Sequence, residues 1–419
     1  MDILLNIKVD KLTMKSDTSV RHCFGTRGLP VPPCPLRTFH GVLVNQPIPT
    51  RSQELRSTIH PDGELILSLD DVPVPEPAAG EVLLRVLAAP VNPTDLGLLL
   101  GPADLAAARQ EEVAGRTVLR APVPRQRMAG LRQRWGVPLS VGIEGAGVVV
   151  AAGAGAESLL GRTVAGMADG MYNRYRLMRA RDCLVLPGGT DARDGASAFV
   201  NPLTALGMVE TMRREGHSAL VHTAAASNVG RMLQRLCQRD GVPVVHIVRS
   251  ATQAQALRDA GADHVCDSSA DGFREALQEA LDATGATLAF DAVGGALTGQ
   301  VLAAMEAVAG RKLAAYDRYG SSTPKHVYVY GTLDVRPLEI PRSVGLAWSA
   351  AGWLMPRFLD RIGEAATQAL HRRVVDELGT TFRSDYGQLV SLADLLNPEL
   401  LKRMAERKTG AKVLVEPQR

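Results

Sequence analysis

The sequence predicts an α/β protein in which a β-rich domain precedes a domain built on a parallel sheet. Residues 58–100 alternate apolar and polar positions between prolines and glycines, a pattern typical of short strands. From about residue 200, short apolar runs alternate with helical patterns, which indicates βαβ units and a parallel sheet. A last apolar run, at 411–415, is again strand-like.

Four runs in the first 190 residues are expected to form strands. Two of them, Leu65–Leu69 and Glu81–Ala88, flank a proline-rich stretch that would turn the chain. Two more lie at 140–153 and 162–167, where small and β-branched residues form short apolar runs. This part of the chain therefore predicts a β-rich domain.

The first βαβ unit begins with the strand-like run ALVHT at 219–223. The following helix has its apolar residues on one face, and Gly241 is expected to end it. The remaining expected elements are strands at 242–248, 263–267, 287–295 and 326–331, helices at 253–260, 272–283 and 297–308, and a helical stretch near 358–378.

Composition excludes several classes of protein. The 419 residues carry 47 basic and 44 acidic side chains, and a net charge of +3 predicts neither a nucleic-acid nor a membrane partner. There is no apolar run of about 18 residues that could span a membrane. Five scattered cysteines without a C-x-x-C pair predict neither a zinc knuckle nor a disulfide framework. A reducing, cytoplasmic location fits best.

Two segments differ from the rest of the chain. Residues 1–40 are basic and contain the proline cluster LPVPPCP, which predicts a disordered extension or a misplaced start codon. A mitochondrial transit peptide is the alternative, although Asp2 and Asp10 are unusual in one. Residues 102–140 carry seven arginines against three acids. We expect either a solvated helical segment, or a lid or contact for an anionic substrate.

The stretch HTAAASNVGRMLQRL, at 222–236, lies where a dinucleotide-binding domain has its phosphate-binding turn. That turn normally reads G-x-G-x-x-G, and alignment on Gly230 places Ala225 and Ser227 at the first two glycine positions. Both are small, Ser227 could cap the helix, and Asn228 tolerates a left-handed conformation. An ordinary strand–turn–helix unit is the alternative.

The residues after the next strand predict which dinucleotide is bound. A ribose-binding residue is expected about 20 residues after the turn, where the sequence has Arg249 and Ser250. No Asp or Glu lies between Asp240 and Asp259. An arginine suits the 2′-phosphate of NADP, so we expect NADPH as the cofactor. An arginine without this role is the alternative.

Taken together, the motifs give the chain a family resemblance over residues 42–417. It resembles the zinc-independent medium-chain dehydrogenase/reductase family, in its quinone-oxidoreductase and enoyl-reductase branch. The motifs are VNPTD (91–95), GIEGAG (142–147), NPLTALGMVE (201–210), the turn at 223–230, LRDAGADHV (257–265), FDAVGG (290–295) and TGAKVLV (409–415). The resemblance implies a GroES-like catalytic domain and a Rossmann-type, doubly wound parallel sheet domain. Their expected ranges are 41–195 and 196–357, with residues 358–419 returning to the catalytic domain.

Zinc members of the family bind the metal through residues that correspond to Asn92, Ile143 and Asn201. Isoleucine cannot bind a metal and the two amides are poor zinc ligands, so no metal is expected. Without a Lewis acid, the chemistry implied is hydride transfer to an acceptor that is already electron-poor. Quinones, enones and enoyl thioesters are such acceptors.

The resemblance also implies roles for individual residues. Asn92 and Asp95 would line or brace the cleft, although Asp95 could equally be a buried capping carboxylate. Enoyl reductases of this type have a tyrosine soon after N-P-x-D, and here the nearest are Tyr172 and Tyr175, which sheet packing could also explain. Thr204 would face the nicotinamide and its ribose, and a role in helix packing is the alternative. The residues expected to bind the cofactor are Asn201, Thr204, Ala225, Ser227, Asn228, Val229, Gly230, Arg249, Ser250, Gly331 and Lys412.

The leading hypothesis is an NADPH-dependent, zinc-independent reductase of quinones or activated alkenes. An enoyl-thioester reductase of fatty-acid metabolism is a second hypothesis, and an NADPH-binding protein with little turnover is a third. The family resemblance further implies a homodimer. The apolar stretch at 344–355 carries two tryptophans and is suited to that contact.

Overall fold

The computed structural model describes residues 47–406 and 412–419. The extension expected over residues 1–40 lies outside the described residues. The described residues form one compact unit, so the expected boundaries at 195/196 and 357/358 remain a prediction. No helix of the described ranges has the length and apolar character needed to cross a membrane.

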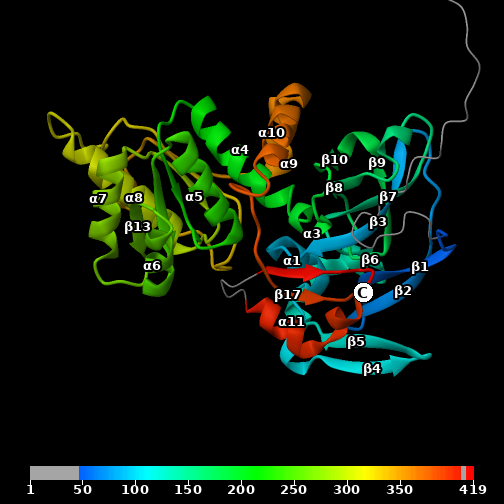
Figure 1. The fold of residues 1–419 in the computed structure, drawn as a ribbon. Helices are drawn as coiled ribbons and strands as arrows, with labels where there is room; N and C mark the ends of the chain where they lie inside the picture. Colours follow the sequence, from blue (N-terminus) through cyan, green and yellow to red (C-terminus); the bar gives the residue numbers. More distant parts are fainter. Residues whose placement is uncertain (1–46, 407–411) are drawn as a thin grey trace, which may run out of the picture. The chain divides into compact units, whose positions relative to one another are not determined.

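Two sheets make up the β-rich part of the chain (Figure 1). The first has the order β4-β5-β2-β1-β6, with strands Arg109–Val113, Arg116–Pro122, Glu64–Pro73, Arg51–Ile59 and Leu139–Ser140. The second has the order β10-β8-β7-β3-β18-β17, with strands Leu184–Val185, Thr163–Met167, Glu144–Ala152, Glu81–Pro90, Lys412–Val415 and Tyr386–Val390. A further strand, β9 (Tyr175–Arg179), pairs with β3. The expected β-rich domain is confirmed.

The third sheet is parallel and has the order β13-β12-β11-β14-β15-β16. Numbered within the sheet, this is the order 3-2-1-4-5-6 of a doubly wound dinucleotide-binding fold, and the Rossmann-type prediction is confirmed. Its strands are β11 (Leu220–His222), β12 (Val244–Val248), β13 (His264–Asp267), β14 (Leu288–Asp291), β15 (Lys325–Val329) and β16 (Trp348–Gly352). The helices are α4 (Val200–Arg214), α5 (Asn228–Asp240), α6 (Ala251–Asp259), α7 (Phe273–Thr284) and α8 (Ala296–Arg311).

Alternate residues of β11 face different layers, as period-2 geometry requires. Leu220 belongs to the core that includes Leu233 and Leu236 of α5. Val221 belongs to the core formed with α7 and α8, in which Leu277 and Leu302 are buried. The sheet is therefore covered by helices on both faces, which explains the uninterrupted apolar character of its strands.

The C-terminal segment returns to the β-rich part. Strand β18 lies between β3 and β17, so Leu414 pairs with Pro90 on one side and with Leu389 on the other. The expected helical stretch near 358–378 is two helices, α9 (Met355–Ile362) and α10 (Glu364–Asp376). The break is at Gly363, which has a φ of +83° that a continuing α-helix cannot contain.

The expectation of a helical segment within 102–140 is wrong for its middle. Strands β4 and β5 form an antiparallel hairpin there, with Val113 paired to Arg116. The two turn residues, Ala114 and Gly115, both have positive φ, which is the requirement of a tight hairpin turn. Short helical turns follow at α2 (Arg125–Met128) and η2 (Ala129–Arg134). Two arginines of the hairpin are in ion pairs, since both Arg109 and Arg120 contact Glu64 at 2.8 Å.

Candidate functional site

The turn between β11 and α5 has the geometry of an anion-binding helix start. The Ser227 hydroxyl oxygen accepts a hydrogen bond of 3.2 Å from the Gly230 amide and caps the helix. A Cβ added at Gly230 would lie 2.1 Å from the Ala225 carbonyl oxygen, so this glycine permits the close helix–strand packing. The left-handed residue of the turn is Ala224, with a φ of +51°, and not Asn228.

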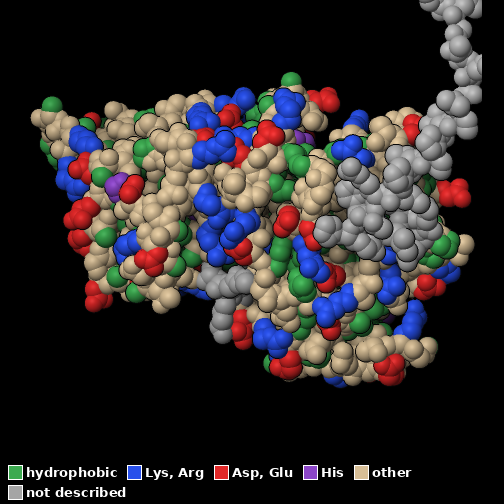
Figure 2. Space-filling model, viewed as in Figure 1, with side chains coloured by type: hydrophobic (Ala, Val, Ile, Leu, Met, Phe, Trp, Pro, Cys, Tyr) green, Lys and Arg blue, Asp and Glu red, His purple; other side chains and the backbone are tan. Residues whose placement is uncertain are grey.

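Asn228 is instead the first residue of α5 and has a different role. Its side-chain amide donates to the Ser384 hydroxyl at 3.1 Å, and this ties the phosphate turn to the segment after α10. Val229, the second residue of α5, is buried. Further along α5, Arg235 donates to the carbonyl oxygens of Thr381 and Arg383, each at 2.8 Å. Figure 2 shows basic side chains gathered over the part of this face where α5 lies.

The residues after β12 lie at the carboxyl end of the sheet, where open α/β folds bind ligands. Ser250 caps α6, because its hydroxyl oxygen accepts from the Gln253 amide at 3.3 Å. Arg249 is exposed, directly between strand and cap. Gly331, which follows β15, lies against the backbone of Ala292, which follows β14, and an added Cβ would be 2.9 Å from the Ala292 carbonyl oxygen.

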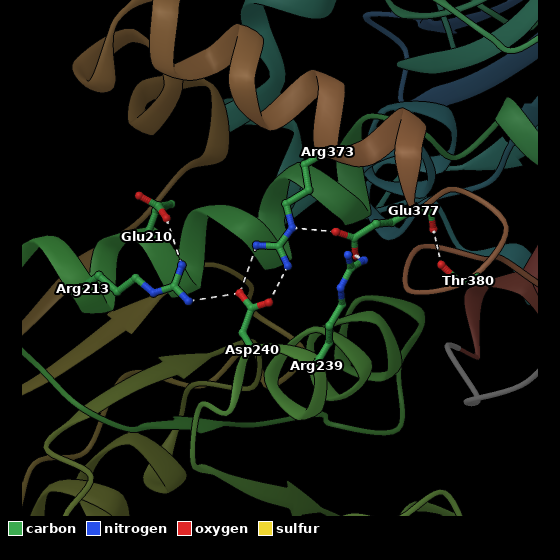
Figure 3. A network of polar contacts seen from close by, with 7 residues as sticks. All are labelled: Glu210, Arg213, Arg239, Asp240, Arg373, Glu377 and Thr380. Carbon is green, nitrogen blue, oxygen red and sulfur yellow. Dashed lines mark hydrogen bonds and ion pairs between the residues drawn. The ribbon is translucent and has the colours of Figure 1, made fainter.

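An ion-pair network fastens α10 to α4 and α5 (Figure 3). Asp240, at the end of α5, accepts from Arg373 of α10 at 2.5 and 2.9 Å. It also accepts from Arg213 of α4 at 3.0 Å. Glu377 pairs with both Arg373 and Arg239, at 2.8 and 2.5 Å. These contacts fix the helix that carries the phosphate turn relative to the returning C-terminal segment.

A second cluster is organised around the fully buried carboxylate of Glu144. One oxygen accepts from the Asn92 side-chain amide at 2.9 Å, and the Lys412 ammonium lies 3.7 Å from it. The other oxygen accepts from the backbone amides of Phe199 and Val200, at 3.2 and 2.9 Å. The Glu144 carboxylate, on β7, therefore joins the N-cap of α1 (Pro93–Leu100), the start of α4 and β18.

Asp95 braces the start of α1 (Pro93–Leu100). Its two oxygens accept from the amides of Asn92 and Ile143, at 2.8 and 3.0 Å. Burial raises its pKa to about 6, nearby Glu144 adds to the rise, and the bond from the Asn92 amide opposes it. This geometry favours the capping interpretation of Asp95.

Two buried amide atoms beside this cluster lack hydrogen-bond partners among the described residues. They are the side-chain oxygen Oδ1 of Asn92 and the side-chain nitrogen Nδ2 of Asn201. Leaving such atoms unpaired costs about 1–3 kcal/mol each, so the pair is suited to meet polar groups of a ligand. Thr204, one turn further along α4, donates its hydroxyl to the Val200 carbonyl oxygen.

Of the two candidate tyrosines, Tyr175 begins β9 and pairs with Arg85 of β3, which favours the sheet-packing alternative. Tyr172 is fully buried in the β-rich core, its hydroxyl donates to the Pro90 carbonyl oxygen at 3.2 Å, and Gly142 packs against its ring. Tyr386, which the sequence motifs do not include, joins the Glu144 cluster through the Ser197 hydroxyl, 2.9 Å away. Sequence reasoning missed it because nothing in the local pattern indicates which strand lies beside Lys412.

The three residues at the positions expected for zinc ligands lie near Glu144 in the sequence or through its contacts. Asn92 donates to Glu144, Ile143 precedes Glu144 in the sequence, and Asn201 follows Val200, whose amide also donates to Glu144. Over residues 47–406 and 412–419, no group of three or more His, Cys, Asp or Glu side chains is placed to hold a metal ion. Zinc independence remains a prediction.

Several known proteins are similar in sequence to this chain. No family model matches the chain. The chain is 25% identical to prostaglandin reductase-3 of Bos taurus over 380 residues, which cover 88% of this chain and 90% of that protein. It is 26% identical to the mitochondrial enoyl-[acyl-carrier-protein] reductase of Xenopus tropicalis over 288 residues, 66% of this chain and 69% of that one. The chain is related to the quinone-oxidoreductase and enoyl-reductase branch of the medium-chain dehydrogenases/reductases. The resemblance expected from the motifs is confirmed.

Solved structures agree on the fold. A Mesorhizobium loti protein assigned as an NADPH:quinone reductase has a TM-score of 0.65 at 23% identity, covering 89% of this chain and all of that one. A mycobacterial protein complexed with NADPH has a TM-score of 0.62 at 21% identity, covering 87% of this chain and 100% of that one. These likenesses confirm a Rossmann-type domain combined with a GroES-like domain.

Proposed function

We propose that the protein is an NADPH-dependent oxidoreductase that transfers a hydride to a quinone or an activated alkene without zinc. The observation that carries this proposal is the Ser227-capped turn between β11 and α5 in a sheet of dinucleotide-binding order, followed by Arg249 directly after β12. A helix N-terminus binds phosphate through its free amides, and an arginine recognises a 2′-phosphate.

The residues present fit NADPH at both ends. The small residues of the turn leave room for the pyrophosphate, and Ser227 and the α5 amides would hold it. Gly331 would let the nicotinamide lie close to the backbone. The unpaired amide atoms of Asn92 and Asn201 would meet the polar groups of the nicotinamide or of the acceptor. Bound NADPH would supply the hydride.

Two arguments support the class of acceptor: the residues at the positions of the zinc ligands, and the names of similar proteins. Asn92, Ile143 and Asn201 offer no ligand set for zinc, so an alkoxide would lack its usual stabilisation and alcohol oxidation is disfavoured. A prostaglandin reductase and quinone reductases are among the similar proteins, and these names describe reductions of electron-poor acceptors. Both support a quinone or an enone as substrate.

Two other functions remain alternatives. The similarity to mitochondrial enoyl-[acyl-carrier-protein] reductases favours an enoyl thioester, whereas the absence of a tyrosine between Asp95 and Met171 disfavours it. A Rattus norvegicus synaptic vesicle membrane protein VAT-1 homolog is 27% identical over 54% of this chain and 49% of that protein. Its name describes no reaction, which keeps an NADPH-binding protein with little turnover as the second alternative.

An acceptor screen separates these alternatives. NADPH oxidation is followed at constant protein concentration with 1,4-benzoquinone, 2-cyclohexenone and crotonyl thioester. The proposal expects turnover with the first or second acceptor. Turnover with the thioester alone would establish the enoyl-reductase alternative. NADPH binding with no consumption on any acceptor would contradict an enzymatic function. A cytoplasmic location and a homodimer belong to the same proposal.

A further inference from the structure

Three side chains from distant parts of the sequence meet at one hydroxyl. The Tyr386 hydroxyl donates to the Ser197 oxygen at 2.9 Å, and the Lys412 ammonium donates to the same oxygen at 2.9 Å. Only 9% of the Lys412 side chain is exposed. A phenol and an ammonium are thus linked through one serine inside the protein.

An irregularity in strand β17 orients the Tyr386 side chain toward Ser197 and Lys412. Strands β17 and β18 pair in parallel with Tyr386 opposite Lys412, and a register shift between Tyr386 and Gln388 interrupts the ladder. Bulges of this kind re-aim a side chain and are common beside active sites. A tyrosine that served only to pack in a regular β-ladder would not require this register shift.

The same group is connected to the residues that carry the unpaired amide atoms. Ser197 lies on the segment that leads into α4, where Val200 donates to Glu144 and the next residue, Asn201, carries an unpaired nitrogen. Lys412 is 3.7 Å from the Glu144 oxygen that also holds Asn92. Buried polar atoms without partners point to a ligand at this place.

We propose that Tyr386 is the proton donor in the reduction of an activated alkene, with Ser197 and Lys412 as positioning residues that restore its proton. The inference rests on the proposed function, whose hydride donor is NADPH. The alkene accepts a hydride at its β-carbon, the C=C π bond breaks, and the electron pair moves to the carbonyl oxygen as an enolate. The α-carbon then takes the phenolic proton as the O–H bond breaks.

The remaining protons balance through the same three side chains. The phenolate takes the Ser197 hydroxyl proton, Ser197 takes one from the Lys412 ammonium, and water returns a proton to Lys412. Burial raises the pKa of Tyr386, which keeps the phenol protonated, and burial lowers the pKa of Lys412, which makes the ammonium a better acid. The charges of Glu144 and Asp95 oppose the lowering at Lys412.

The test compares two acceptors with different proton requirements. An enone must be protonated on carbon, whereas a reduced quinone is protonated on oxygen by water. Tyr386→Phe should lower kcat with 2-methyl-2-cyclohexenone by about 100-fold, the usual scale of general acid catalysis, and leave kcat with 1,4-benzoquinone unchanged. The residual product should lose its single configuration at C2. NADPH binding measured by calorimetry should stay at the wild-type affinity.

Tyr328→Phe is the matched control, because it removes a hydroxyl from another strand, β15, where Tyr328 donates to Glu215 at 2.8 Å. It should retain both activities and the product configuration. An equal loss on both acceptors in Tyr386→Phe, or full enone turnover with unchanged configuration, would overturn the role of Tyr386 and leave the proposed function standing. A wild-type protein that reduces only quinones would also overturn the role of Tyr386 and leave the proposed function standing. A wild type that reduces neither acceptor would overturn both proposals.

Discussion

Single residues carry the proposed cofactor preference. Ser227 retains the capping function although the first two glycines of the usual turn are replaced, and Gly230 retains the one position where a side chain has no room. Ala224 has the left-handed conformation that a glycine would adopt more easily. Strain at one alanine therefore accompanies the altered turn. The residue that distinguishes NADPH from NADH is predicted to be Arg249.

Arg249→Ala should remove most of the preference for NADPH. A charge-assisted hydrogen bond is worth about 1.5–3 kcal/mol, which corresponds to roughly ten- to a hundredfold in kcat/KM. The variant should lose efficiency with NADPH and keep that with NADH, which has no 2′-phosphate. Arg249→Asp should shift the preference further toward NADH, because a carboxylate repels the phosphate. Steady-state kinetics with both cofactors tests this, and an equal loss with both would exclude Arg249 from the role.

At the scale of elements, regular patterns were predicted and irregular ones were not. The helix α5 and the strands β11 to β15 follow from apolar periodicity, because their buried faces leave a clear signal. Strand β16 was missed because its residues WSAAG are exposed and do not alternate. The β4–β5 hairpin was missed because its turn is Ala114–Gly115 rather than Asn-Gly.

The candidate site also combines residues that local motifs predict with contacts that no local motif predicts. Local motifs predicted Asn92, Asp95 and the phosphate turn as site residues, since each is part of a short sequence pattern. The contacts of Lys412 with Ser197 and of Tyr386 with the same hydroxyl join segments far apart in sequence. A single sequence carries no information on such pairings.

The junction of α5 with α10 should contribute measurably to stability. Asp240→Asn weakens charge-assisted bonds to Arg373 and Arg213, and we expect the free energy of unfolding to fall by about 1.5–3 kcal/mol. The bonds from Arg373 lower the pKa of Asp240 in the folded state, so its contribution is present above the unfolded pKa of about 3.9 and is lost as pH falls. The free energies of unfolding in urea should thus differ at pH 7, and the difference should shrink progressively as the pH falls below about 3.9. A constant difference across this range would contradict the ion-pair explanation.

At the scale of the whole molecule, the parallel sheet ends on β16, which pairs only with β15 among the described strands. Leu346 and Leu354, on either side of it, are 70% and 59% exposed. An edge strand with exposed apolar neighbours is suited to an isologous contact with a second copy. The predicted homodimer would use this edge.

Leu346→Asp should convert the dimer into a monomer at micromolar concentration, because a carboxylate would be buried without a partner in the contact. Leu160→Asp is the control, since Leu160 is 53% exposed but lies in the β-rich part. Light scattering reports both masses. A wild-type monomer, or equal effects of the two substitutions, would exclude this interface.

Zinc-independent hydride transfer from NADPH is tested by measuring activity and metal content together. NADPH oxidation with 1,4-benzoquinone and 2-cyclohexenone is measured before and after the protein is treated with a strong chelator, with the metal content determined in both samples. The account predicts turnover with at least one acceptor, no stoichiometric zinc, and the same rate after treatment, because Asn92, Ile143 and Asn201 offer no ligand set. About one zinc per chain with activity lost on its removal would contradict the account.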